Sequence, residues 1–142
     1  MANTFHLAIP AGDLHNAIYF YCHVLGCTKG NSEINPPDSW CDINFWGNEL
    51  TLHASTCKIT SEGHNVDMGN VQVPHFGVHL EPEEFKSLKE RLINNNIKFV
   101  EEPFIRFKGK ILEQETMFIE DPNGNVLEIK TMVNPDALFE NY

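Results

Sequence analysis

The sequence has no apolar run that approaches the roughly 18 residues needed to cross a bilayer. Its first residues also lack the basic start and apolar stretch of a secretory signal. Positive charge is scarce, since twenty acidic residues stand against ten basic ones and give a net charge of −10. Such a field repels phosphate backbones. We therefore expect a cytoplasmic protein without a membrane or nucleic-acid partner.

The four cysteines, at positions 22, 27, 41 and 57, include no Cys-x-x-Cys pair. Without that spacing, and without a sign of export, neither a disulfide framework nor a thiolate metal site is expected. We expect reduced cysteines, with Cys22 and Cys41 in segments patterned for burial.

The composition that remains is that of an ordinary globular domain. Of the 142 residues, 42% are apolar and 21% are charged, which is enough for one core. We expect a single domain over 1–142. Its expected parts are a first module over about 4–55, a connector over about 56–72, a second module over about 73–132 and a loosely held tail over 133–142.

The first half of the sequence predicts a strand, a helix and three further strands. Asp13 suits the N-cap of the helix and Gly26 its end. Gly47-Asn48 separates two alternating segments, as in a β-hairpin. The predicted elements are a strand over 5–10, a helix over 13–25, a weak strand near 27–31 and a hairpin of strands over 40–46 and 49–53.

The second half repeats this order after a polar connector without periodicity, which can order as a lid. Pro82 fits the first position of a helix and the acids beside it favour a first turn. Phe85, Leu88 and Leu92 mark its buried stripe. The predicted elements are strands over 73–80, 97–100, 115–120 and 125–131 and a helix from 81 to about 93, with a turn at 121–124.

The two halves form an internal repeat. His6 opens the first and His75 opens the second, at an offset of 75 − 6 = 69 residues, and a Gly-Asn turn precedes the last strand of each half. Duplicated units commonly pack about a pseudo-twofold axis, so equivalent positions converge on one cleft. Placing the first and last strands at that cleft directs His6, His75 and Glu128 inward together.

Two imidazoles and a carboxylate suit a divalent ion such as Fe, Mn, Zn or Ni, with open positions for a substrate. A carboxylate flanked by Leu127 and Ile129 is costly to bury unless it is paired or bound to metal. The alternative for Glu128 is an outward-facing charge that shares a face with Lys130.

These segments carry a family resemblance that covers nearly the whole chain. The motifs concerned are His6-Leu7-Ala8-Ile9-Pro10, Phe20-Tyr21, Val24-Leu25-Gly26, Pro74-His75-Phe76-Gly77-Val78 and Asp121-Pro122-Asn123-Gly124-Asn125-Val126-Leu127-Glu128. With these motifs the sequence resembles the vicinal-oxygen-chelate superfamily, which includes glyoxalase I, extradiol dioxygenases and the fosfomycin- and bleomycin-resistance proteins.

The resemblance implies an α+β fold of two tandem βαβββ modules, with a curled eight-stranded mixed sheet around a metal cleft. It implies ligands on the first and last strands of each module. His6, His75 and Glu128 match three such positions, and His53 is the candidate for the fourth. Glu49 lies on the same face but earlier in its strand than the family pattern requires. The family also implies that a homodimer can form.

Further residues are candidates for chemistry and substrate binding. His53, if it is not a ligand, can serve as an acid–base group or as a solvated strand end, and Glu115 is a second candidate base. Arg106 and Gln114 can grip an anionic or carbonyl-bearing substrate, or lie in a solvated loop. His79 shares the face of His75, where a pocket role and a structural one both remain open.

Two functions follow from this reading. The first is a metal-dependent enzyme of the glyoxalase or dioxygenase type, which acts on a small substrate whose oxygens chelate a divalent ion. The alternative is a non-catalytic protein that sequesters a small molecule or antibiotic, as the bleomycin-resistance proteins do. The strong acidity would suit a cationic drug. A protein without any small ligand is the third option.

Overall fold

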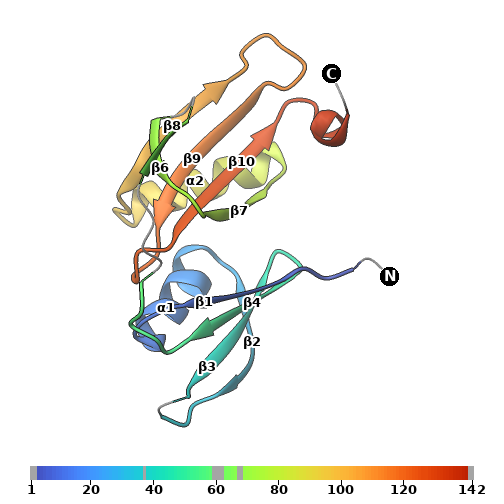
Figure 1. The fold of residues 1–142 in the computed structure, drawn as a ribbon. Coiled ribbons are helices and arrows are strands. Elements are labelled where there is room, and N and C mark those ends of the chain that lie inside the picture. The colour runs from blue at the N-terminus through green and yellow to red at the C-terminus, as the bar shows by residue number, and fades with distance from the viewer. Residues whose placement is uncertain (1–2, 37, 59–62, 67–68, 141–142) are drawn as a thin grey trace. The chain divides into compact units, whose positions relative to one another are not determined.

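The computed structural model describes residues 3–36, 38–58, 63–66 and 69–140. The chain folds into two compact units. The first contains residues 1–60 together with the turn 121–125, and the second contains residues 61–120 and 126–142. Each unit has a four-stranded sheet and helical cover of its own, so the predicted α+β repeat of two βαβββ modules is confirmed (Figure 1).

The first unit has a mixed sheet with the strand order β1-β4-β3-β2. Strand β1 runs parallel to β4, and the other neighbours are antiparallel. Its elements are β1 (His6–Pro10), α1 (Leu14–Ile18), the π-helix η1 (Tyr19–Val24), β2 (Thr28–Glu33), β3 (Trp40–Phe45) and β4 (Asn48–His53).

The helical segment of this unit differs from the single α-helix expected over 13–25. Asp13 caps α1 as predicted, accepting from the Asn16 N–H at 3.0 Å. The chain then widens into a π-helix, in which the Leu25 N–H donates to the Phe20 carbonyl five residues back. Tyr21 is fully buried there, and its hydroxyl donates to Asp121 at 2.8 Å.

The sheet of the first unit has one apolar and one polar face, as alternation predicts. Alternate residues of β3 and β4 are buried in the core, namely Cys41, Ile43, Phe45, Leu50 and Leu52. The strand register puts His6, Glu49, Thr51 and Asp42 on the opposite face. The polar face is therefore the one that can offer ligands.

The turn Asp121–Asn125 belongs to the first unit although its flanking strands belong to the second. Asp121 Oδ1 accepts the N–H groups of Asn123 and Asn125, each at 2.9 Å. The side-chain amides of the two asparagines both donate to the Pro10 carbonyl at 2.8 Å. The predicted Asp-Pro-Asn-Gly turn thus binds the end of β1, 113 residues away from Asn123.

The second unit has the sheet order β7-β10-β9-β8 and a separate two-stranded sheet, β5-β6. Strand β7 is parallel to β10, as β1 is to β4. Its elements are β5 (Gly63–Val66), β6 (Gly69–Gln72), β7 (Phe76–His79), α2 (Pro82–Asn94), β8 (Phe99–Arg106), β9 (Gln114–Glu120), β10 (Val126–Met132) and the 3-10 helix η2 (Pro135–Phe139).

Helix α2 covers one face of this sheet (Figure 1). Pro82 occupies its first turn with acids beside it, and the predicted stripe of Phe85, Leu88 and Leu92 is buried. The opposite face is apolar at one end. Val71 of β6 packs there with Phe118 and Val126. The same face also carries the polar residues of the candidate site, among them Thr116 and Glu128.

Three segments of the second unit are more ordered than expected. The connector was predicted without strands, but Gly63–Val66 pairs with Gly69–Gln72. The strand predicted at 97–100 continues to Arg106, because residues 104–106 pair in register with 114–116. The tail forms the turn of η2.

Two further expectations concerned membrane-spanning helices and the cysteines. Among the described residues no helix is long and apolar enough to cross a membrane. None of the four cysteines, all of which lie among the described residues, forms a disulfide. Cys41 is buried and burial raises the pKa of its thiol, against an opposing effect of Lys29. The thiol of Cys22, which is partly exposed, has its pKa raised by the same cause.

Candidate metal centre

The second unit brings His75 and Glu128 together. His75 Nε2 lies 3.2 Å from Glu128 Oε1, although 53 residues separate the two in sequence. The other ring nitrogen, Nδ1, lies 2.8 Å from the Gln72 carbonyl, which can only accept a hydrogen bond. Nδ1 therefore carries the proton, and in the neutral ring Nε2 presents its lone pair to the carboxylate.

The nitrogen lone pair and the carboxylate oxygen repel each other. A positive charge on the imidazole, or a cation between the two groups, removes this repulsion. Protonation of His75 supplies one, and so does a divalent ion. Two ligands that each stand about 2.1 Å from one ion are about 3.0–3.4 Å apart, and the observed separation of 3.2 Å falls in that range. The pair therefore fits two positions of a metal site.

Glu128 is buried, with 7% of its side chain exposed, so the outward-facing alternative is wrong. Its second oxygen, Oε2, accepts from the Thr116 hydroxyl at 2.8 Å. The Lys130 ammonium lies 3.6 Å from the same oxygen. Thr116 thus orients the carboxylate with Oε1 toward His75, in the way that outer contacts orient metal ligands.

The close approach of β7 and β10 makes this contact feasible. Gly77 is the register partner of Glu128, and a Cβ added at Gly77 would overlap the Glu128 carbonyl oxygen. Any larger residue at 77 would force the two strands apart. The His75 ring also packs edge-on against Phe118, with ring centroids 5.3 Å apart, which fixes its direction.

In the first unit His6 pairs with Glu49. The two are register partners on β1 and β4, and Nδ1 lies 2.7 Å from Oε1. Both side chains are about half exposed. Glu49, which the sequence pattern placed too early in its strand, is therefore the carboxylate that contacts His6.

His53, the residue predicted for the fourth ligand, is not brought to His6. It shares the face of Glu49, but it stands four residues further along β4, opposite Pro10. Four residues of strand span about 13 Å, far beyond the separation of two ligands of one ion. His53 instead lines a surface cavity of about 380 Å³ together with Asp38, Ser39, Trp40, Ala54 and Ser55.

The repeat identifies a second polar contact that the sequence analysis missed. Register pairs Thr51 with Ala8 as it pairs Glu128 with Gly77, so Thr51 occupies the position equivalent to Glu128. Its hydroxyl donates to Asp42 at 2.7 Å. Alternation in the segment 40–46 was the available signal for Asp42, which lies opposite the face of Cys41 and Ile43.

Neither unit gathers three or more of its described His, Cys, Asp or Glu side chains into a group that could hold a metal ion. His6 belongs to the first unit, and His75 and Glu128 belong to the second. The full ligand set of His6, His75, Glu128 and His53 stays a prediction. Of its members, the structure brings His75 and Glu128 into contact.

The predicted substrate residues lie on the polar face of the second sheet. His79 is the register partner of Lys130, and Gln114 is that of Arg106, so all four share the face of Glu128 and Thr116. Burial lowers the pKa of His79, and the Lys130 charge lowers it further against the opposing effect of Glu128. His79 is therefore held as a neutral imidazole at neutral pH.

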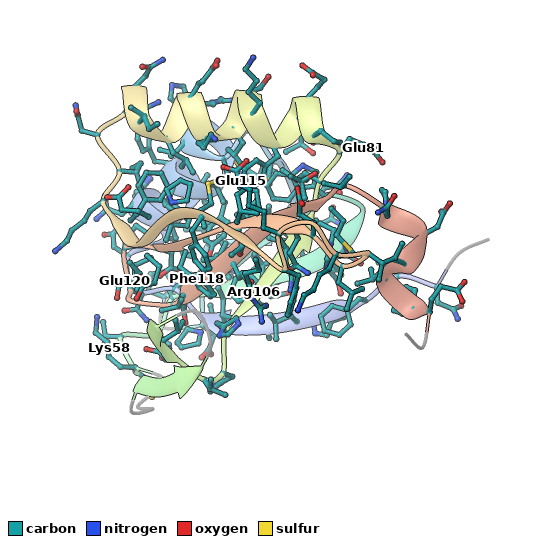
Figure 2. The ribbon with its side chains drawn as sticks, turned by 90° about the horizontal axis from the view of Figure 1, so that it is seen from above. Lys58, Glu81, Arg106, Glu115, Phe118 and Glu120 are labelled. Carbon is teal, nitrogen blue, oxygen red and sulfur yellow. The ribbon has the colours of Figure 1, made fainter. Side chains whose placement is uncertain are left out.

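Glu115, the second candidate base, lies on the other face of the sheet. It neighbours Thr116 in β9, and successive side chains of a strand alternate. Its carboxylate accepts from the Lys89 ammonium of α2 at 2.8 Å. Figure 2 shows Glu115 on the side of the strands that α2 covers, and Arg106 and Phe118 away from it. The structure does not bring Glu115 to Glu128.

Taken together, two βαβββ modules, each with a histidine on or just before its first strand and a carboxylate on its last strand, define a class of proteins. The Glyoxalase/Bleomycin resistance protein/Dioxygenase superfamily model matches residues 4–129. The chain belongs to this superfamily, as the resemblance of the motifs predicted. A search of curated proteins gave no match.

The fold of this chain is also similar to those of solved structures with related names. A glyoxalase/bleomycin resistance protein/dioxygenase from Alicyclobacillus acidocaldarius is 33% identical, with a TM-score of 0.74 over 96% of each chain. A glyoxalase/dioxygenase from Nostoc punctiforme is 17% identical, with a TM-score of 0.67 over 92% of this chain and 90% of its own. The fosfomycin resistance protein FosX from Listeria monocytogenes is 12% identical, with a TM-score of 0.64 over 92% of each. The last two show the fold alone.

Proposed function

We propose that the protein is a divalent-metal-dependent enzyme of the glyoxalase or dioxygenase type, acting on a small substrate with metal-chelating oxygens. The observation that carries the proposal is the facing of His75 Nε2 and the buried Glu128 carboxylate at 3.2 Å. Burying a carboxylate against an unprotonated ring nitrogen costs free energy that a cation offsets. A bound divalent ion would polarise a substrate oxygen and stabilise negative charge that develops on it.

The protein's own groups have assigned parts in this proposal. His75 and Glu128 would hold the ion. Thr116 keeps the carboxylate in position through its 2.8 Å hydrogen bond. The Gln72 carbonyl fixes the His75 tautomer through Nδ1. Phe118 packs beside His75 and excludes water from that side.

A neutral imidazole near Glu128 supports a part for His79 in proton transfer. The lowered pKa of His79 keeps its ring unprotonated near pH 7, so one nitrogen can accept a proton from a substrate bound at the site. Glu115 has no part, since its carboxylate is engaged by Lys89.

The test is elemental analysis of the purified protein, followed by turnover on three panels. Hemithioacetals test isomerisation and catechols test ring opening with dioxygen. Fosfomycin is included because one solved structure of the same fold bears that name. The proposal expects a divalent ion in near one-to-one ratio, turnover on one panel, and loss of both in Glu128→Gln. A protein that takes up no ion and is inert on all panels would refute it.

The second candidate is a metal-free binding protein of the bleomycin-resistance type. The 3.6 Å approach of the Lys130 ammonium to Glu128 favours it, because that cation already offsets part of the carboxylate charge. Calorimetry of bleomycin against chelator-treated protein separates the two. Tight binding without any ion, together with inert panels, would favour sequestration.

A further inference from the structure

A surface cavity opens at one end of the polar face of the first sheet. Its volume is about 380 Å³, and residues 38–40 and 53–55 line it. Trp40 of β3 and His53 of β4 are register partners, so their side chains leave the sheet on the same face. All six lining residues belong to the first unit. We call this feature the Trp40 cavity, and its size suits a small organic molecule.

Backbone hydrogen bonds hold the two walls of the Trp40 cavity together. The Ala54 N–H donates to the Ser39 carbonyl at 2.9 Å, and the Ser55 N–H donates to the His53 carbonyl at 2.7 Å. The Gly12 N–H, which follows β1, donates to the Ser55 carbonyl at 2.8 Å. The lining segments are therefore joined to each other and to the chain after β1. A ligand would meet a preformed site and would lose little affinity to the ordering of its walls.

The charges around the Trp40 cavity favour a cation. Asp38 is exposed, and no lysine or arginine is among the described residues that line the cavity. Glu33, the register partner of Trp40 on β2, adds a second carboxylate on the neighbouring strand. Lys58 directs its ammonium to the Asn123 carbonyl, at 3.1 Å. The local charge is thus negative and has the same sign as the net charge of −10 on the whole chain.

Trp40 supplies an aromatic surface next to this charge. The residue is partly exposed, and the face of an indole attracts organic cations more strongly than other aromatic rings do. Among the described residues, no hydrogen bond or ion pair engages the side chain of Asp38 or His53. One carboxylate beside an aromatic ring suits an organic cation better than a bare metal ion such as Ca²⁺, which takes six or more oxygen ligands.

We infer that the Trp40 cavity binds a small organic cation, either an amine in its ammonium form or a quaternary ammonium. The cation lies against the Trp40 ring, and the Asp38 carboxylate offsets its charge. The N–H groups of an amine also donate to that carboxylate, whereas a quaternary ammonium uses the ring and the charge alone. The inference does not depend on the proposed function, because neither His75 nor Glu128 lines this cavity.

The test measures binding to the full chain by calorimetry. The probes are n-butylammonium, tetramethylammonium and the uncharged 1-butanol, all at one ionic strength because salt screens exposed charges. At least one cation is expected to bind about tenfold more tightly than 1-butanol. Tighter binding of n-butylammonium identifies the ligand as an amine, and tighter binding of tetramethylammonium identifies it as a quaternary ammonium. Failure of both cations to bind, or equal affinity for 1-butanol, would overturn the inference.

Two variants of Trp40 test the aromatic contact. Trp40→Leu should weaken cation binding by about two- to thirtyfold, the range that corresponds to a cation–π contact. Trp40→Phe retains an aromatic face and should recover most of that loss, which separates the electrostatic effect of the ring from apolar packing. Equal losses in the two variants would show that the ring does not bind the cation.

Asp38→Asn tests the local charge. It should weaken cation binding by about two- to fivefold, the modest effect usual for an exposed ion pair. Asp136→Asn is the matched control, because it removes the same charge at an exposed position of η2 in the second unit. Binding to the control should equal binding to the original protein. Equal losses in Asp38→Asn and Asp136→Asn would show that the cations respond to the overall charge alone, and would overturn the site.

Discussion

His75 and Glu128 face each other at 3.2 Å because parallel pairing of β7 and β10 brings the start of one strand beside the middle of the other. The contact joins a half-buried imidazole, whose Nδ1 is occupied by the Gln72 carbonyl, to a carboxylate held by Thr116. These two contacts fix the orientation of both side chains. This relationship is the basis of the first two predictions.

Replacing Glu128 by Gln should lower the affinity for a divalent ion by at least about tenfold, the effect usual for altered metal surroundings. The amide keeps the size of the side chain but removes the negative charge. Affinity is measured by titration with Zn²⁺ or Mn²⁺ and a competing chelator. Glu115→Gln is the matched control, because Glu115 pairs with Lys89 on the opposite face. Equal losses in both variants would contradict the site.

Gly77→Ala should destabilise the protein by about 3 kcal/mol, at the upper end of overpacking costs. The new Cβ would overlap the backbone carbonyl of Glu128, and only separation of β7 from β10 relieves that overlap. Urea unfolding measures the change. Gly30→Ala is the control, since its Cβ would stand 3.4 Å from Asp42 and requires little movement. A Gly77 variant as stable as the Gly30 variant would contradict the close approach.

Glu49→Gln should weaken metal binding more than His53→Gln does. Glu49 contacts His6 at 2.7 Å. His53 lies four residues further along β4, where it is the register partner of Pro10 and not of His6. Both substitutions leave an uncharged amide at an exposed position of β4. The same chelator competition applies. A greater loss in His53→Gln would restore the ligand predicted from the sequence pattern and exclude Glu49.

Tyr21 should remain protonated in the folded protein well above pH 10. Burial raises its pKa first, and the Asp121 charge and hydrogen bond raise it further. Since the unfolded chain releases this proton above about pH 10, its contribution to stability is complete below that pH and is lost as the pH rises further. The free energy of unfolding of Tyr21→Phe should therefore decrease less above about pH 10 than that of the original protein.

Phenolate absorbance tests the same point in the native state. Tyr21→Phe should leave the titration of the folded protein unchanged, because Tyr21 does not ionise there. Loss of native absorbance change in Tyr21→Phe would show that the buried hydroxyl ionises normally.

Asn123→Ala should cost about 1–3 kcal/mol, the combined contribution of the two hydrogen bonds that its buried side chain donates. Its amide donates to the carbonyls of Pro10 at 2.8 Å and Cys57 at 3.1 Å. Thermal or urea unfolding measures the loss. Asn134→Ala removes a longer, exposed hydrogen bond to Ile111 and should change stability by less than about 0.5 kcal/mol. Similar losses in the two variants would contradict this account.

Much of the fold could be predicted because its signals are local. Asp13, Gly26 and Pro82 delimit helices through caps and fixed backbone angles, and alternation placed the strands of both hairpins. The repeat then paired His6 with His75 as openings of equivalent modules. The strands β5 and β6 and the extension of β8 were missed, since their pairing gives no periodic signal in the sequence.

The candidate site divides in the same way. Alternation and the repeat by themselves placed His6 and His79 on first strands and Glu128 on a last strand, whereas His75 lies just before β7 and not within the strand predicted over 73–80. Only the tertiary structure decided that Glu49 rather than His53 meets His6, that Glu115 turns to Lys89, and that Lys130 stands beside Glu128. The reason is register: pattern tells which face a side chain takes, but only the pairing of strands decides which residues lie at the same level.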